Sequence, residues 1–320
     1  MKSELRRKLA GASWFPANGI ERSFVRHINR QKSEALIWHE RPEMNRVILS
    51  VIIPTSDAYR EGFFYQLLDQ ISLQTLRNYE LIVVRGDSRQ GRAINFGAAL
   101  AQGDYLLTLD DDTSLTDPLT FEKLVGFMET QPNIGIAGGN NVIPENANRF
   151  VKRVMQEIPR RSWKPVSTIT DSDLAEHPCM IIRAENFKAV GGENELIPRG
   201  LDPYLRERFR LHGKRVVVAP GVIYHHMPPE NLAKLLRQFH RNGRHAAYVN
   251  RHYPKWIIET PANHGHFEVR KPFILRVLRF PLRLVCSLIE SKHILFFCEV
   301  AYASGFVYEL LLGKRQRIVA

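Results

Sequence analysis

Residues 92–112 read RAINFGAALAQGDYLLTLDDD, and the fold prediction depends on this stretch. Its first half has helical spacing and small residues that allow close packing. Its second half is an apolar segment from Tyr105 to Leu109, broken only by Thr108, and three aspartates follow it directly. A helix followed by a buried strand that ends in polar residues is typical of an α/β fold, in which ligands bind beyond the carboxyl ends of the strands.

The same alternation extends in both directions from this stretch. The expected strands are apolar on both faces, as central parallel strands are, and lie at 47–53, 79–88, 104–112, 133–143 and 214–226. The expected helices lie at 62–76, 92–104, 118–132 and 202–213, and a strand with a short helix is expected over 177–192. We therefore predict an α/β fold with a central, mostly parallel sheet flanked by helices. Residues 1–46 are expected to be a basic extension, irregular or with short helices, and residues 228–320 a basic and amphipathic helical region.

The composition is that of a basic chain with enough apolar residues for a sizeable core. Of its 320 residues 44% are hydrophobic, and the formal net charge is +12, which favours polyanions as partners. The three cysteines include no CxxC pair, so we expect reduced, buried thiols and a cytoplasmic protein. The N-terminus lacks the apolar core of a secretory signal. No stretch has about 18 uninterrupted apolar residues, so a spanning helix is not expected.

Three adjacent carboxylates, Asp110, Asp111 and Asp112, follow the central strand. Neighbouring side chains on a strand point to opposite sides, so Asp110 and Asp112 are expected on one side and Asp111 on the other. A D-x-D pair supplies hard oxygen ligands for Mg2+ or Mn2+ and leaves positions open for phosphate oxygens. The alternative interpretation is an ordinary acidic turn that precedes a capped helix.

Several segments, in order, resemble the family 2 glycosyltransferases, which have the GT-A fold. They are SVIIPT (50–55), ELIVVRGDS (80–88), GRAINFGAALAQGDYLLTLDDDT (91–113), FKAVGGENELIPRGLDPYLRERFRLHGKRVVVAP (187–220) and VIYHH (222–226). The resemblance covers roughly residues 47–245. It implies a catalytic domain over 47–227, with a nucleotide-sugar half at 47–145 and an acceptor half at 146–227. It also implies a divalent cation, Mn2+ or Mg2+, as cofactor.

The resemblance assigns the donor to the strand ends of the first half. Pro54 and Thr55 would line the nucleoside pocket, Asp87 would read the base, and Arg92 would lie near the diphosphate, for which a guanidinium is well suited. The sequence departs from the family in the RGDS segment (85–88) and in the short distance from it to Arg92. The nucleotide of the donor, UDP, GDP or dTDP, therefore stays open.

The same resemblance assigns the metal to Asp110 and Asp112, with Asp112 as the more direct ligand, and groups Asp110 and Asp111 with the substrate-binding residues. A histidine at the end of the strand 214–226 is expected as a further ligand. His225 and His226 both stand there, on opposite faces of the strand, and the prediction is His225.

The acceptor half is expected to supply a general base. The segment GLDPYLR (200–206) matches an acidic motif at a helix start, in which Asp202 holds the position of the base. Leu201 and Tyr204 replace the other acidic residues of that motif. An inverting transfer needs a base because an acceptor hydroxyl has a high pKa. The alternative is that Asp202 only caps the helix ahead of Pro203.

The C-terminal region indicates how the enzyme would meet its acceptor. The Q-x-x-R-W signature of processive synthases is absent, because Asn242 follows Gln238 and Arg241, so transfer of a single sugar to a saccharide or lipid-linked acceptor is expected. Apolar residues of 275–289 alternate at spacings of three and four beside several arginines, which predicts a basic amphipathic helix. This helix is expected either on an anionic membrane surface or against a second helix, within the chain or across a homodimer.

Three other functions fit parts of the sequence. A sugar nucleotidyltransferase also uses acidic metal ligands, but PTSDAYREGFF (54–64) lacks the glycine-rich basic loop of that class. A basic nucleic-acid-binding protein would fit the charge, but no motif of that class is present, and no nucleic acid is expected as a partner. An inactive scaffold is disfavoured because Asp110, Asp112 and Asp202 are all present.

Overall fold

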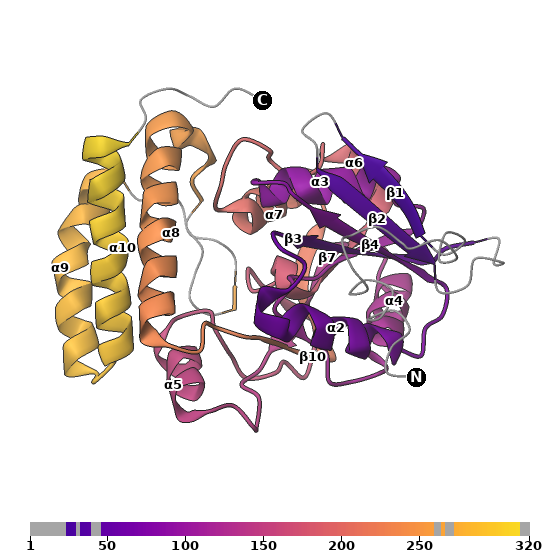
Figure 1. Cartoon of the computed structure of the whole chain (residues 1–320), viewed down its shortest axis with the longest axis horizontal. Helices are drawn as coiled ribbons and strands as arrows, with labels where there is room; N and C mark the ends of the chain where they lie inside the picture. Colours follow the sequence, from indigo (N-terminus) through magenta and orange to yellow (C-terminus); the bar gives the residue numbers. More distant parts are fainter. Residues whose placement is uncertain (1–23, 30–32, 40–45, 259–263, 266–271, 314–320) are drawn as a thin grey trace.

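The computed structural model describes residues 24–29, 33–39, 46–258, 264–265 and 272–313. A β-sheet with helices on both faces makes up one side of the molecule, and three long C-terminal helices stand beside it (Figure 1). The predicted α/β fold with flanking helices and a helical C-terminal region is therefore confirmed.

Within the described residues the sheet has ten strands. Nine follow one another in the order β1-β2-β4-β3-β5-β9-β7-β10-β6, and β8 pairs with β10 beside this path. The strands are β1 (Phe24–Ile28), β2 (Glu34–His39), β3 (Leu49–Thr55), β4 (Tyr79–Arg85), β5 (Tyr105–Thr108), β6 (Thr113–Ser114), β7 (Ile134–Asn141), β8 (Thr170–Asp171), β9 (Met180–Arg183) and β10 (Arg215–His226). The pairs β4–β3, β3–β5 and β7–β10 are parallel. Strand β9 lies antiparallel between β5 and β7 and so joins the two parallel parts of the sheet.

The central strands are buried on both faces, and each face has its own apolar core. Odd-numbered residues of β3, such as Val51 and Ile53, pack with α2 (Phe63–Ser72) and α4 (Thr120–Thr130). Ile52 of the same strand packs on the other face with α3 (Gln90–Leu100), α6 (Ala184–Ala189) and α7 (Leu201–Leu211). This two-sided burial is why these strands read as continuous apolar runs rather than as alternating ones.

The prediction of an irregular or helical N-terminal extension is wrong for the described part of it. Residues Phe24–Ile28 and Glu34–His39 form two antiparallel strands, and β2 continues the sheet beside β4. Ala35 and Ile37 join one core and Leu36 joins the other, so β2 is buried on both faces like a central strand. The apolar run ALIW (35–38) carried this signal, but it is short and lies among basic residues. Apart from residues 29, 33 and 46, the rest of the extension lies outside the described part of the chain.

The C-terminal region contains α8 (Leu232–His252), α9 (Phe273–Ile289) and α10 (His293–Leu312). Helix α10 packs between the other two (Figure 1). Helices α8 and α10 approach closely at Gly243 and Gly305, where an added Cβ would meet the backbone of the opposite helix. Of the helices in the described ranges, only α10 has the length and apolar character to span a membrane. Cys179 and Cys298 are buried free thiols as expected, whereas Cys286 is exposed.

Candidate active site

The three aspartates lie in the turn between β5 and β6, and the pairing of β6 with β10 completes their surroundings. Strand β6 is only two residues long, and Thr113 and Ser114 lie opposite His226 and His225. The amide of Met227 also donates to the carbonyl of Asp112 at 3.2 Å. The end of β10 is thereby held beside the aspartates, although the two segments are far apart in the sequence.

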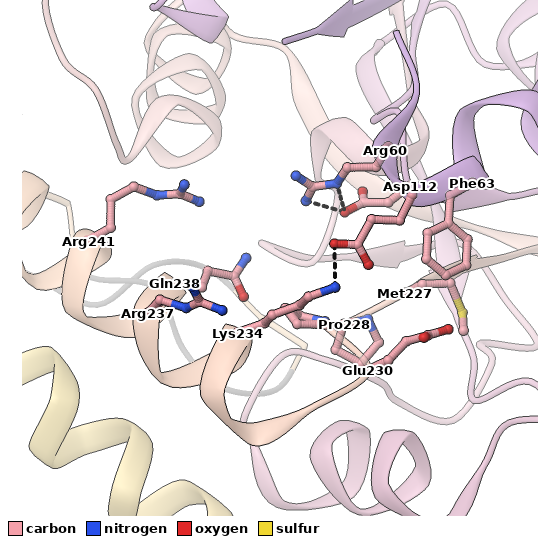
Figure 2. Close-up of a pocket in the computed structure, with 12 residues that line it drawn as sticks. Arg60, Phe63, Asp112, Met227, Pro228, Glu230, Lys234, Arg237, Gln238 and Arg241 are labelled. Atoms are coloured by element: carbon pink, nitrogen blue, oxygen red, sulfur yellow. Dashed lines mark hydrogen bonds and ion pairs between the residues drawn. The ribbon is translucent and has the colours of Figure 1, made fainter. Parts of the chain in front are cut away.

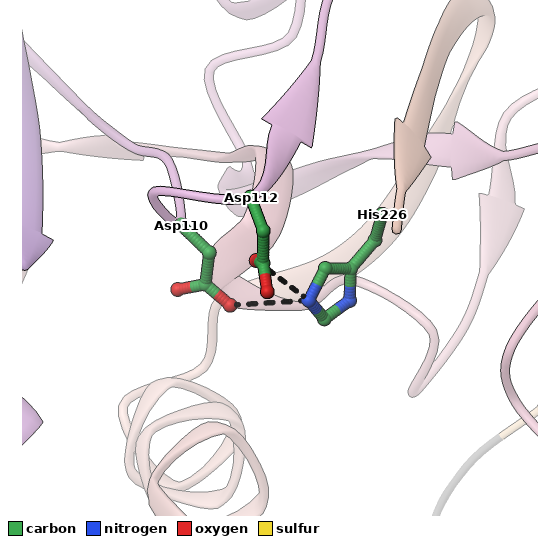
Figure 3. A group of neighbouring side chains, drawn as sticks. All are labelled: Asp110, Asp112 and His226. Carbon is green, nitrogen blue, oxygen red and sulfur yellow. Dashed lines mark ion pairs between the residues drawn. The ribbon is translucent and has the colours of Figure 1, made fainter. Parts of the chain in front are cut away.

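Asp110, Asp112 and His226 face one another and form a group of potential metal ligands (Figure 3). One ligand atom from each residue lies within 4.8 Å of the others. The His226 Nε2 atom is 3.1 Å from Asp112 Oδ1 and 3.8 Å from Asp110 Oδ2. Two carboxylates and an imidazole are a suitable donor set for Mn2+, and the carboxylates suit Mg2+ as well.

The prediction of His225 as the metal-ligating histidine does not agree with this geometry and is corrected to His226. The His225 Nδ1 atom lies 2.5 Å from the carbonyl oxygen of Val142, on the other side of the strand. The sequence indicated a histidine at this strand end and showed that only one of the pair faces the site. Which one faces it depends on the register of β10 against β6, and that register is a property of the tertiary structure.

The aspartates differ in their electrostatic surroundings. Burial, together with the charge of Asp112, raises the pKa of Asp110 to about 7 against the attraction of His226. Burial acts on Asp112 as well, but His226 and Arg60 outweigh it and lower the pKa of this carboxyl. Burial lowers the pKa of the His226 imidazole, but the charges of Asp112 and Asp110 outweigh it and raise this pKa. The group therefore already contains a negative charge that a cation would neutralise.

Asp111 is not a member of the ligand group and contacts Thr55 instead. Its Oδ2 atom accepts a hydrogen bond of 2.6 Å from the hydroxyl of Thr55, at the end of β3. Burial raises the pKa of Asp111 to about 6. The structure thus connects Asp111 to one of the two residues predicted for the nucleoside pocket, and it places Pro54 next to Thr55 in the same strand.

Arg60 is a site residue that the sequence analysis missed. Its Nη2 and Nε atoms lie 2.6 and 3.0 Å from Asp112 Oδ2, as Figure 2 shows, and its Nε atom lies 3.5 Å from Asp111 Oδ1. Arg60 belongs to a loop in which Ala58, Arg60 and Glu61 all have positive φ angles, which are unfavourable for residues other than glycine. No motif in the sequence marks this residue, because its position depends on that unusual backbone.

A cavity of about 380 Å³ opens between this loop and α8 (Figure 2). Asp112 and Arg60 line one side of it, and Lys234, Arg237 and Arg241 of α8 line the other. The Lys234 ammonium is paired with Glu61 at 2.7 Å. The ligand group therefore borders a cavity with a basic opposite wall, which suits a ligand that carries negative charge.

Asp87 and Arg92, predicted for separate roles, bind each other. The Arg92 Nε atom lies 2.8 Å from Asp87 Oδ2, and the hydroxyl of Ser33 donates to the same oxygen at 2.7 Å. Burial favours a higher pKa for Asp87, but the hydrogen bonds from Arg92 and Ser33 outweigh it and lower this pKa. Gln90, in the first turn of the same helix, donates to Asp110 at 2.9 Å and so connects α3 to the ligand group.

Asp202 lies in the first turn of α7, at the edge of a polar cluster that the sequence analysis did not identify. Its Oδ1 atom accepts a hydrogen bond of 2.8 Å from the amide of His177. The His177 ring is fully buried, with Nε2 2.8 Å from Glu193 and 4.0 Å from Asp202, and Nδ1 3.1 Å from the hydroxyl of Thr108. Burial disfavours the charged ring, but Asp202 and Glu193 outweigh it and raise the pKa of His177 to about 9.

The Asp202 carboxylate keeps its charge and is partly exposed to solvent. Burial works against the charge, but His177 and Arg206 lower the pKa of Asp202. Its side chain is still 28% exposed. The N-cap of α7 is Gly200, and no side chain caps this helix; Asp202 lies inside the first turn, and its Oδ1 atom bonds to the amide of His177 in another segment. A carboxylate that is charged and partly exposed can accept a proton, but its lowered pKa makes it a weaker base than an ordinary aspartate.

Comparison with known proteins agrees with the fold and with the predicted family. Residues 85–191 match glycosyl transferase family 2. A protein of Haemophilus influenzae named as an uncharacterized glycosyltransferase is 27% identical, over 49% of this chain and 60% of the relative. The O-antigen biosynthesis protein RfbC of Myxococcus xanthus is 23% identical over 64% of this chain. The chain spans 60% and 20% of the lengths of these two relatives.

Among solved structures, the mannosyltransferase PcManGT from Pyrobaculum calidifontis, in complex with GDP-Man and Mn2+, has a similar fold. The TM-score is 0.52 at 13% identity, and the match covers 83% of this chain and 88% of that one. The segment matched by the family includes Asp87, Arg92 and the D-x-D aspartates. Over residues 85–191 the chain is therefore similar to glycosyl transferase family 2.

Proposed function

We propose that the chain is a metal-dependent, inverting glycosyltransferase that moves one sugar from a nucleoside diphosphate sugar to a saccharide or lipid-linked acceptor. The observation that carries this proposal is the juxtaposition of Asp110, Asp112 and His226, together with the cavity that Asp112 lines opposite the basic residues of α8. Within an α/β sheet of this family, the ligand group lies at the strand ends, where substrates bind.

The residues that would hold the cation are Asp110, Asp112 and His226. When bound, a divalent cation supplies positive charge that stabilises the departing nucleoside diphosphate. Arg60 would assist from the same side, because its guanidinium is at hydrogen-bonding distance from Asp112 and its planar donors suit phosphate oxygens. Without a ligand, the arginine neutralises part of the charge of the aspartates.

The donor would lie across the first half of the sheet. PcManGT, which shares the fold, was solved with GDP-Man and Mn2+, and this supports a nucleotide sugar as the donor here. Pro54 and Thr55 remain the proposed wall of the nucleoside pocket. Because Arg92 is bound to Asp87, we propose that this pair shapes the base site together, rather than that Arg92 contacts the diphosphate by itself.

Asp202 is proposed as the general base of the acceptor half. Its carboxylate would take the proton from the acceptor hydroxyl as the hydroxyl oxygen forms a bond to the anomeric carbon. The bond between that carbon and the diphosphate oxygen breaks on the opposite face, and the configuration of the sugar is inverted. The imidazolium of His177 and its neighbour Glu193 would position this carboxylate.

The C-terminal helices are proposed to bring the enzyme to an anionic membrane surface, on the cytoplasmic face. Leu278, Leu282 and Ile289 of α9 are 63%, 65% and 77% exposed, although each is large and apolar. Arg279 and Arg283 of the same helix are exposed as well. Arg283 is paired with Glu299 at 2.7 Å, so the charge that acidic headgroups would attract is mainly that of Arg279. Since α10 packs closely on the basic helix α8, we propose that it lies along the surface instead of crossing it.

A thermal-shift screen tests the proposal directly. UDP-, GDP- and dTDP-sugars are compared with and without Mn2+, and oligonucleotides serve as the arm for the nucleic-acid alternative. We expect one nucleotide class to raise the Tm, only when Mn2+ is present, and we expect Asp112→Asn to remove the shift. A Tm increase that is equal without Mn2+ or equal in the variant would refute the metal role.

A further inference from the structure

A second cavity, also of about 380 Å³, adjoins the one at the ligand group. It lies between the loop after β4, the segment before α7 and the helices α8 and α10. Arg241 lines both cavities, so they meet at this residue. The second cavity contains none of the proposed metal ligands, and the proposed function assigns nothing to it.

The wall of the second cavity is strongly basic. Among its described lining residues are Arg89, Arg241 and Arg244, with Glu309 as the one carboxylate. Glu309 is already paired with Arg244, with Oε2 2.9 Å from Nε. Among the described lining residues, no carboxylate is therefore left to neutralise the positive charges of Arg89 and Arg241. Arginines arranged in this way are typical of sites for phosphate groups.

His245 lies among these arginines and responds to their charge. Burial and the charges of Arg241, Arg199, Arg89 and Arg244 lower the pKa of its imidazole to about 4. The ring of Tyr248 on the same helix lies 5.7 Å from the guanidinium carbon of Arg89 and helps to hold that side chain. Burial and the positive charge of the cavity thus both disfavour the imidazolium form of His245.

We propose that the second cavity binds a phosphate or diphosphate group of the acceptor. The donor diphosphate is assigned to the first cavity, where Asp112 and Arg60 lie, so a phosphate in the second cavity must come from another molecule. An acceptor bound there extends past Arg241 toward the ligand group. This inference rests on the proposed function and gives the acceptor a chemical class, a phosphorylated saccharide that is either soluble or lipid-linked.

The experiment follows the ring resonance of His245 by NMR in the full chain, with His245→Asn used to assign it. Inorganic phosphate is titrated first, and then a soluble sugar phosphate and vesicles that contain phosphatidic acid. We expect phosphate to raise the pKa of His245, because an anion stabilises the imidazolium. We also expect Arg89→Gln and Arg241→Gln each to weaken phosphate binding about tenfold. The control for net charge is Arg149→Gln, which changes an exposed arginine of α5 (Arg149–Glu157). This variant should bind phosphate as the unmodified protein does.

The titrations distinguish a soluble from a lipid-linked source of the phosphate, and they test the acceptor site separately from the proposed function. Competition by the sugar phosphate assigns a soluble acceptor, and competition only by the vesicles assigns a lipid-linked one. The inference would be overturned if phosphate left the pKa of His245 unchanged, or if it changed that pKa equally in Arg241→Gln. It would also be overturned if nucleoside diphosphate with Mn2+ displaced the phosphate. Nucleotide binding with Mn2+ is measured in the same samples. If the protein bound phosphate but not nucleotide with Mn2+, the proposed function would be wrong. If it bound nucleotide with Mn2+ but not phosphate, only the acceptor site would be wrong.

Discussion

The Nε2 atom of His226 lies 3.1 Å from Oδ1 of Asp112, and His225, the next residue back along the chain, bonds to the carbonyl of Val142 instead. Two adjacent histidines thus differ completely in their surroundings. If the ligand group holds a cation, His226→Ala should weaken Mn2+ binding at least about tenfold. His225→Ala is the matched control and should leave the affinity for Mn2+ unchanged. Isothermal titration with Mn2+ checks this prediction, and equal losses in both variants would contradict it.

Arg60 competes with a cation for the charge of Asp112. Its guanidinium lies 2.6 Å from Asp112 Oδ2, with 40% of its side chain exposed to solvent. Replacing it in Arg60→Ala should therefore raise the affinity for Mn2+ in the absence of nucleotide, by roughly fivefold for a contribution of about 1 kcal/mol. Arg60→Lys keeps the charge and should change the affinity less. The same titration reports both variants, and weaker Mn2+ binding in Arg60→Ala would show that the arginine supports the ligands instead.

Asp202→Asn should abolish transfer and leave donor binding intact. The side-chain amide introduced by this substitution retains an oxygen that can accept the hydrogen bond from His177, so the local structure is expected to persist. It cannot accept a proton at neutral pH, and loss of a general base typically lowers the rate about 100-fold to 10,000-fold. Turnover and nucleotide binding are measured on the same preparation. A variant that loses nucleotide binding would place Asp202 in the donor half.

The contact between α8 and α10 depends on two glycines. In Gly305→Ala the new methyl group would meet the carbonyl of His240, so we expect a loss of about 1–3 kcal/mol in the free energy of unfolding. Gly126→Ala in α4 is the control, because its new methyl group would meet nothing within 4 Å beyond the backbone of its own helix turns, and it should stabilise the protein by up to about 1 kcal/mol. Thermal unfolding measures both. Equal stability of the two variants would mean that the helices adjust without cost.

Leu282→Asp should prevent binding to anionic vesicles if α9 lies on a membrane. The side chain is 65% exposed in the middle of the apolar face of α9. Leu211→Asp changes a similarly exposed leucine of α7, 72% exposed, and should have no effect. Vesicle sedimentation with phosphatidylserine and with phosphatidylcholine alone checks the charge dependence. If Leu282→Asp instead converted a dimer to a monomer in sedimentation velocity, the apolar face would be a homodimer interface.

Much of the fold was predictable from local sequence. The apolar runs of β3, β4 and β5 and the amphipathic pattern of α2 and α4 appear where they were expected, because burial on both faces of a sheet requires such runs. The strand β2 was not predicted, because a short apolar run does not by itself indicate a strand. It becomes one by pairing with β4, which is distant in the sequence. The boundaries between domains and halves remain predictions.

The site was predictable in part, for a related reason. The sequence by itself predicted the three aspartates at the end of a buried strand, because an apolar run followed directly by polar residues is a local signal. Only the tertiary structure decided that His226 joins them, that Arg60 faces Asp112, and that Asp87 binds Arg92. These contacts depend on strand register and on an unusual loop conformation, and both are set by packing between segments that are distant in the chain.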